Sequence, residues 1–330
     1  MKTKLLKTGI ILFAFTIVLI ASICSCAKKD DTYNDTKNYN SDAFALPEID
    51  LSGSAGPASH SGIECNESKL KNNSAKNGTV YVYGNPEQRI DTIVELMGFD
   101  IDDYEPAFDG KKRLYTKDTM KMYIDEYGVF NLTDTSASWK GGNCSLSDKE
   151  YAEKAKQYLV EHDLWPVGQI GDARTTETST SSSKGTIILS KGVTFYPKSI
   201  NGFKVGGTRR ITVMFNDEGQ VSDVYYNWRI YSSRRAADML PISEAIEKIK
   251  SGKATFDTDD DDFYYSDGIN INSVEVIYWD EATNPDNLTA QPVYVFIGKA
   301  TKSNGKTSNV YFSVQANVTD ADTNVTDSMK

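Results

Sequence analysis

The sequence contains very little histidine: His60 and His162 are the only two among its 330 residues. Nucleophilic catalysis by serine or cysteine usually needs a histidine base, and histidine-based metal sites need several such ligands. His162 follows a predicted amphipathic helix, where a cation near the C-terminal end is favourable for structural reasons. The composition therefore excludes a histidine-based metal centre and speaks against serine- or cysteine-type catalysis. We expect a protein that is not an enzyme.

Cysteine is scarce as well, with four residues at Cys24, Cys26, Cys65 and Cys144. No Cys-x-x-Cys pair lies beyond Cys26, so the sequence gives no support to redox catalysis or to a thiolate zinc site. Outside the cytoplasm, Cys65 and Cys144 can form a disulfide that closes a loop of about 80 residues. Two buried or free thiols are the alternative, and the sequence leaves both open.

The only long apolar run is Gly9–Ala21, which follows a short basic segment with Lys2, Lys4 and Lys7. This order is typical of a secretory signal, and the run is short for a membrane span of about 20 residues. It predicts a signal peptide over residues 1–25.

Ile23 stands three residues before Cys26, and Ser25 stands directly before it. In this spacing the segment resembles the lipobox of bacterial lipoproteins. The resemblance implies that Cys26 becomes lipidated and anchors the chain to a membrane, facing outside the cytoplasm. Its two acyl chains suffice for stable anchoring. An ordinary signal peptide cut nearby, or an uncleaved anchor, is the alternative.

The formal net charge is −10, and removing the three lysines of the signal peptide makes it about −13. An acidic surface disfavours nucleic acid and anionic lipid as direct partners. We therefore expect no nucleic-acid partner.

Beyond the signal peptide, the pattern predicts an α+β fold of two tandem units, each a curved antiparallel sheet with a helix packed on one face. The stretch before these units is rich in Asp, Asn and Ser and has no apolar periodicity, so we expect it to be a disordered tether. The predicted segments are the tether at 26–75, a first unit at 76–146, a second unit at 147–318 with a Ser/Thr-rich loop at 172–185, and a polar tail at 319–330.

Three helices are marked by their first and last residues. Pro86 opens one that Gly98 ends, a Ser-x-x-Glu capping box at Ser147–Glu150 opens the second, and the third spans 243–250. Alternating apolar residues and turn signals predict strands in between. These are 79–83, 121–125, 129–132, 186–189, 193–196, 203–205, 210–215, 221–230, 273–279, 292–297 and 309–318.

The second half carries a set of short matches to one family. They are Ala152, Ala155, Tyr158 and Leu159 on a helix, Tyr196 before Asn201-Gly202-Phe203, the turn at 217–221, and the runs 240–246 and 291–296. In these it resembles the PepSY-like modules of extracytoplasmic bacterial proteins, and most of all the YycH/YycI type of regulatory ectodomain. The resemblance covers about residues 148–318 and implies binding or regulation outside the cell. YycH/YycI proteins are usually held by a transmembrane helix, whereas this chain has a lipobox.

Tyrosines and aspartates supply the remaining candidate residues. Tyr225, Tyr294 and Tyr311 lie on predicted strands, and exposed tyrosines on a sheet can form a binding surface. Asp257, Asp259 and Asp261 alternate in an acidic run that could hold calcium, although the EF-hand order is absent. A solvated acidic loop is the alternative, and no other cofactor is predicted.

Three functions fit these observations. The first is a non-catalytic, membrane-anchored module that binds and regulates another envelope protein. The second is a PepSY-like inhibitor or chaperone of an exported protease. The third is an envelope hydrolase that uses a pair of carboxylates.

Overall fold

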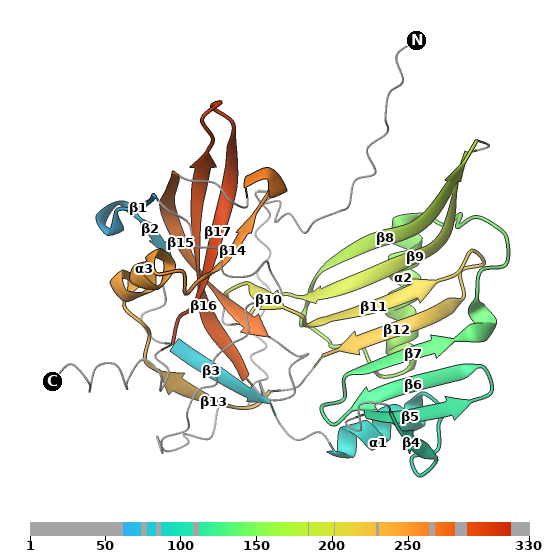
Figure 1. Cartoon of the computed structure of the whole chain (residues 1–330). Helices are drawn as coiled ribbons and strands as arrows, with labels where there is room; N and C mark the ends of the chain where they lie inside the picture. Colours follow the sequence, from blue (N-terminus) through green and yellow to red (C-terminus); the bar gives the residue numbers. More distant parts are fainter. Residues whose placement is uncertain are drawn as a thin grey trace, which may run out of the picture.

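The computed structural model describes residues 62–73, 78–83, 87–107, 112–183, 185–200, 202–228, 231–263, 268–280 and 289–317. The predicted signal peptide, Cys26, most of the predicted tether and the predicted tail lie outside these ranges. No helix within them is long and apolar enough to span a membrane. Two sheets, here called sheet A and sheet B, organise the described residues (Figure 1). The α+β class predicted from the sequence is confirmed.

Sheet B has eight strands that are antiparallel throughout, in the order β4-β5-β6-β7-β12-β11-β9-β8. Helices α1 (Glu87–Leu96) and α2 (Asp148–Glu161) contribute to its core. The strands are β4 (Tyr104–Pro106), β5 (Lys112–Lys117), β6 (Met120–Asp125), β7 (Phe130–Asp134), β8 (Ile170–Ser182), β9 (Gly185–Pro197), β11 (Arg210–Phe215) and β12 (Val221–Asn227).

The core of sheet B follows from strand alternation. On β11, Ile211, Val213 and Phe215 are buried while the residues between them are half-buried. They join the apolar stripes of both helices in one cluster, where Tyr151 of α2 packs against Phe215 with ring centroids 5.3 Å apart. The alternation predicted for this strand is confirmed, and it assigns the buried residues to the helix-covered face.

Sheet A has nine strands, with β1-β15-β16-β17-β14 as its main path and β2, β3, β10 and β13 attached to it. Helix α3 (Ile242–Lys250) packs into its core through Ala245, Ile246 and Ile249. The strands are β1 (Ile63–Cys65), β2 (Lys71–Asn73), β3 (Gly78–Tyr83), β10 (Val205–Gly207), β13 (Tyr231–Ala237), β14 (Thr255–Thr258), β15 (Ile269–Asp280), β16 (Thr289–Thr301) and β17 (Thr307–Gln315).

Two of the predicted helix signals, the capping box at Ser147 and the stop at Gly98, are confirmed, whereas Pro86 lies outside the described residues. Ser147 accepts a hydrogen bond from the backbone N–H of Glu150, and the Glu150 carboxylate accepts one from the backbone N–H of Ser147, which completes the capping box. After α1 the chain turns at Gly98, whose φ of +82° lies in the region that glycine tolerates best. Local sequence therefore sets where these helices begin and end.

The boundary predicted between residues 146 and 147 does not separate two sheets. Strand β7 from the first predicted unit pairs with β12 from the second, so sheet B contains both. Strand β3 pairs with β13 and β16, which places it in sheet A with the C-terminal strands. There are two sheets, but each takes strands from both predicted units. Pairing between strands that are far apart in the sequence leaves no local signal, so the sequence did not predict this arrangement.

The Ser/Thr-rich loop predicted at 172–185 is wrong. Strand β8 runs through most of it and pairs with β9 from Ile170↔Pro197 to Ser182↔Gly185. Polar residues can form this hairpin because most of β8 is exposed at the edge of sheet B, and threonine itself favours strands. The two short strands predicted at 186–189 and 193–196 are one strand, β9.

The predicted tether also ends earlier than expected. Strands β1 and β2 lie within it and pair in parallel with β15. A short 3-10 helix, Glu67–Lys69, separates them, and Ile63, Cys65 and Leu70 pack against the core of sheet A. A few apolar side chains in a polar stretch are thus enough to complete the edge of a sheet.

A candidate binding face on the eight-stranded sheet

One face of sheet B is covered by helices, and the other is open. Figure 1 shows α2 behind the strands and no labelled element in front of them. The side chains that alternate with the buried ones must lie on this open face. Among them Tyr123 is 40% exposed, and Asn131 and Arg174 are also exposed.

Strand register aligns six residues of this face in a row across the sheet, and Thr194 among them is buried. Each pairs directly with the next on the neighbouring strand. From β8 to β6 the row is Arg174, Thr194, Thr212, Tyr225, Asn131 and Tyr123. Because neighbouring strands are about 4.8 Å apart, it is about 24 Å long.

Two arginines on this face stack on tyrosine rings. The Arg210 guanidinium carbon lies 5.2 Å from the centroid of the Tyr225 ring, and that of Arg174 lies 5.2 Å from the centroid of the Tyr196 ring. These four residues belong to four adjacent strands, in the order Arg174 (β8), Tyr196 (β9), Arg210 (β11) and Tyr225 (β12). We call this set the arginine–tyrosine ladder.

One ladder residue, Tyr225, is held by a hydrogen bond from a buried neighbour. Asn227 donates from Nδ2 to the Tyr225 hydroxyl (3.0 Å) and to the Thr208 carbonyl oxygen (3.1 Å). The hydroxyls of Thr194 and Thr212 lie 2.9 Å apart in the row beside it. Side chains fixed in this way lose little conformational entropy when they bind a partner.

Gly192 keeps the middle of the face flat. A Cβ atom at this position would lie 2.6 Å from Sδ of Met214 and 2.7 Å from Oγ1 of Thr176. The absence of a side chain lets Met214 and Thr176 approach each other over the β9 backbone. A flat surface of this kind suits a broad partner rather than a small enclosed ligand.

The end of the ladder next to sheet A is anchored by a buried ion pair. Nη1 of Arg209 lies 3.5 Å from Oδ2 of Asp280 on β15, and both side chains are almost fully buried. The same guanidinium stacks 4.4 Å from the centroid of the Trp228 ring and donates to Oε1 of Gln169 (3.2 Å). These contacts fix the start of β11, and thus Arg210, relative to sheet A.

A hollow of about 280 Å³ lies on the helix side of sheet B, lined in part by Leu96, Trp165 and Trp228. Trp228 donates from Nε1 to Oε1 of Gln169 (3.2 Å), so the indole N–H is already bonded within the protein. The hollow is on the face opposite to the ladder.

The three tyrosines predicted to share a binding surface do not do so. Tyr225 belongs to the open face of sheet B, whereas Tyr294 and Tyr311 belong to sheet A. Tyr294 is 3% exposed and donates its hydroxyl hydrogen to the Leu240 carbonyl oxygen (3.0 Å), and burial raises its pKa. It is a core residue, because the alternation of β16 points it toward α3.

Tyr311 is half-buried and donates to Oδ1 of Asp259 (3.1 Å), while Asn309 donates to Oδ2 of the same carboxylate (2.7 Å). Burial and the Asp259 charge raise the pKa of Tyr311 to about 12. Tyr311 therefore stays protonated at neutral pH and serves as a hydrogen-bond donor to Asp259, the first residue of the acidic turn 259–262 that follows β14.

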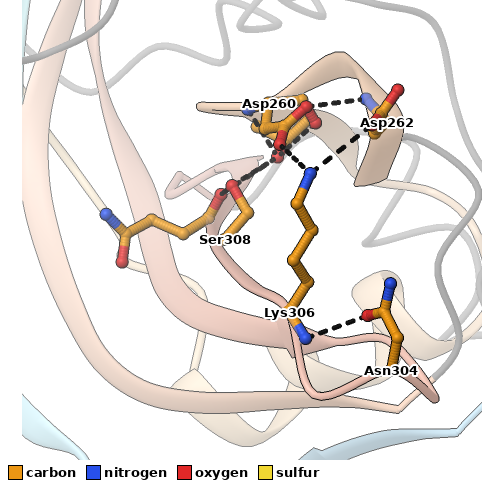
Figure 2. A network of polar contacts seen from close by, with 7 residues as sticks. Asp260, Asp262, Asn304, Lys306 and Ser308 are labelled. Carbon is orange, nitrogen blue, oxygen red and sulfur yellow. Dashed lines mark hydrogen bonds and ion pairs between the residues drawn. The ribbon is translucent and has the colours of Figure 1, made fainter.

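The predicted calcium ligands surround this turn, which Figure 2 shows from close by. Nζ of Lys306 lies 4.0 Å from Oδ2 of Asp260 and 3.8 Å from Oδ2 of Asp262, so a lysine supplies positive charge here. Asp257 lies on β14, and Asp259 is the first residue after it. The side chain of Asp261 is outside the part of the chain that the structure describes. The described residues contain no group of three side chains placed to hold a metal, and the calcium site stays a prediction.

Cys65 and Cys144 are both free thiols, so the disulfide is not formed. Cys65 packs against the core of sheet A and Cys144 lies in the core of sheet B, where its Sγ is 3.6 Å from the Asn216 carbonyl oxygen. Burial raises the pKa of the Cys65 thiol. The two cores keep the two sulfurs apart.

His162 caps α2, with Nδ1 2.8 Å from the Tyr158 carbonyl oxygen and its ring 4.2 Å from the Tyr158 ring. Its predicted structural position at the helix end is confirmed.

Sequence reasoning missed three of the four ladder residues. The signal for Arg210 was present, because Ile211, Val213 and Phe215 alternate inward and so place Arg210 outward. Tyr196 follows in the same way from β9. Arg174 had no such signal, because its strand was predicted to be a loop.

Comparison with known proteins places the chain in no family. No family model matches it, and no curated protein matches it. Among solved structures it is similar to an uncharacterized protein from Eubacterium rectale, with 13% identity over 74% of this chain and 85% of that one, and a TM-score of 0.39.

Proposed function

We propose that this chain is a lipoprotein, anchored through Cys26 to the outer side of a membrane, that binds and regulates another envelope protein without catalysis. The basic segment, the apolar run and the lipobox-like residues before Cys26 support the anchor. The face proposed to bind the partner is the open face of sheet B.

The observation that carries this proposal is the arginine–tyrosine ladder. Tyrosine and arginine are the residue types most often found at the energetic centre of protein interfaces. Here they occupy a flat, open sheet face rather than the edge of a catalytic cleft. Arg210 and Tyr225 are half-buried and ordered by their neighbours, as residues at the centre of an interface need to be.

In-cell crosslinking of the full-length protein, followed by mass spectrometry of the captured material, tests the proposal. We expect one dominant envelope protein, and we expect it to disappear with Cys26→Ala, which removes the lipidated residue. Capture should also fall with Tyr225→Ala and persist with Tyr123→Ala at the far end of the row. Capture of abundant wall components alone would contradict the proposal.

A further inference from the structure

The arginine–tyrosine ladder carries positive charge on an acidic protein. The chain has a formal net charge of −10, yet the ladder brings two guanidinium groups onto one surface. Among the described residues, neither Arg174 nor Arg210 has a carboxylate partner within 4.0 Å. Arg209, next to Arg210 in sequence, does have one in Asp280. The two ladder arginines therefore differ from their buried neighbour in lacking a counter-charge.

The two arginines lie two strands apart on the same face. Arg174 is in register with Thr212 of β11, two residues along from Arg210, so two strand spacings across the sheet and two residues along it put the two Cα atoms about 12 Å apart. This is more than the Debye length of about 8 Å at physiological ionic strength, so the repulsion between the two charges is largely screened and each guanidinium group can bind an anion independently. A partner with negative charge at this spacing would gain charge-assisted hydrogen bonds from both groups.

The nearby carboxylate on the same face does not fill this role. Asp223 lies on β12, one residue pair along from Tyr225, and its Oδ1 accepts a hydrogen bond from Thr133 of β7 (2.9 Å). The Asp223 carboxylate therefore points toward β7, whereas Arg210 lies on β11, on the other side of β12. Asp172, two residues before Arg174 on β8, makes no ion pair within 4.0 Å with either ladder arginine among the described residues, and Thr176, Thr194 and Thr212 around the ladder are neutral.

We propose that the ladder binds an extended, acidic segment of the partner protein, with one carboxylate on Arg174 and another on Arg210. In an extended chain, side chains two residues apart lie on one face about 6.7 Å apart, and those four residues apart lie on the same face about 13 Å apart. Acidic residues four positions apart therefore match the spacing of the two arginines, and the rings of Tyr196 and Tyr225 lie beside the residues between them. This inference rests on the proposed function and names the chemistry of the partner.

A protein segment fits the ladder better than a membrane surface does. The arginine planes are held by tyrosine rings at fixed positions, which suits paired, in-plane recognition of carboxylates. A membrane would instead attract mobile lysines at the rim of the molecule. Anionic vesicles and an anionic polysaccharide are accordingly controls in the test.

The test uses the mature lipoprotein in detergent and a synthetic probe peptide in which glutamate and threonine alternate, with a glutamine–threonine peptide as its neutral counterpart. We expect the acidic peptide alone to bind, with an affinity that falls as salt increases. Arg174→Gln together with Arg210→Gln should weaken binding at least tenfold. Lys149→Gln with Lys253→Gln, exposed positions outside the open face, removes the same charge and should leave binding unchanged.

Arg174→Lys with Arg210→Lys keeps the positive charge but removes the guanidinium groups, so it distinguishes carboxylate recognition by guanidinium from a general charge effect. We expect this variant to bind the acidic peptide several-fold more weakly than the wild type. Thermal unfolding of each variant shows that sheet B is intact. Equal binding of the two peptides, undiminished binding by the double glutamine variant, or preferential binding to phosphatidylglycerol vesicles or dextran sulfate would overturn the inference.

In-cell capture separates this inference from the proposed function. If the double glutamine variant still captures the same envelope protein as the wild type, the ladder is not the site, although the chain remains a binding protein. If the wild type captures no protein, the proposed function itself fails.

Discussion

Replacing Asp280 by asparagine should destabilise the junction between the two sheets. The side chains of Arg209 and Asp280 are 5% and 0% exposed, and their charged atoms are 3.5 Å apart. Asp280→Asn leaves the Arg209 guanidinium buried without this counter-charge, and burying an unpaired charge is strongly unfavourable. The shape of the side chain is retained, so the loss reports the charge rather than a cavity.

The structure sets the expected magnitude. Removing one partner of a buried ion pair costs about 3–5 kcal/mol. Here the distance is long for a charge-assisted hydrogen bond, and Arg209 keeps its hydrogen bond to Gln169 and its contact with the Trp228 ring. We therefore expect a loss at the lower end, about 3 kcal/mol in the free energy of unfolding.

Urea unfolding of the purified protein, followed by circular dichroism and tryptophan fluorescence, measures this loss. Glu275→Gln is the control, because it removes the partner of Lys204 from an exposed pair, which should cost less than about 1 kcal/mol. Adding Arg209→Met to Asp280→Asn should restore part of the stability, since no buried charge then lacks a partner. Equal losses for Asp280→Asn and Glu275→Gln would refute the reasoning.

The remaining predictions concern the helix cap, the core, a thiol and acid. Ser147→Ala should cost about 1 kcal/mol in chemical unfolding, whereas Ser147→Asp, which keeps a capping oxygen, should cost less. Phe312→Ala should cost about 3–5 kcal/mol, because the ring is almost fully buried in the core of sheet A. Cys144 should react with a thiol reagent only on unfolding, and fast labelling of the folded protein would contradict its burial. Hydrogen bonds from Lys191 and Thr175 lower the pKa of Asp148, so their stabilisation is present above the unfolded pKa of about 3.9 and is lost as the pH falls through the folded one. Asp148→Asn should remove that part of the acid dependence, measured as the midpoint of urea unfolding between pH 5 and pH 2.

Local features of the fold could be predicted from the sequence, whereas the pairing of distant strands could not, and the reason is physical. The capping box at Ser147 and the alternation of Ile211, Val213 and Phe215 act within a few residues, so their signals are visible in the sequence. The pairing of β7 with β12 depends on which strands meet after the chain has turned several times. No short stretch encodes that choice, and the predicted division into two consecutive units failed for this reason.

The candidate site was harder to predict than the fold. Tyr225 was identified because an aromatic residue on an alternating strand is conspicuous, but the same reasoning included Tyr294, which alternation directs into the core. Arg174 lies in a run of threonines and serines whose composition is typical of loops. Strand β8 forms because it can pair with the edge of β9, and the sequence of residues 170–182 alone does not show that this partner is there.

The pairing of β3 with β16 also bears on how the protein is made. Val82 and Thr289 are partners in sheet A, and Ile63 pairs with Ile269, so these contacts join residues about 200 positions apart. A ribosome releases the N-terminal strands long before their partners exist, and closing such large loops slows folding. Sheet A can close only after translation has passed residue 315, the end of β17. Nascent chains of this protein must therefore carry unpaired strand edges until β17 has been made, and a premature stop within β17 would leave the earliest strands without a complete sheet to join.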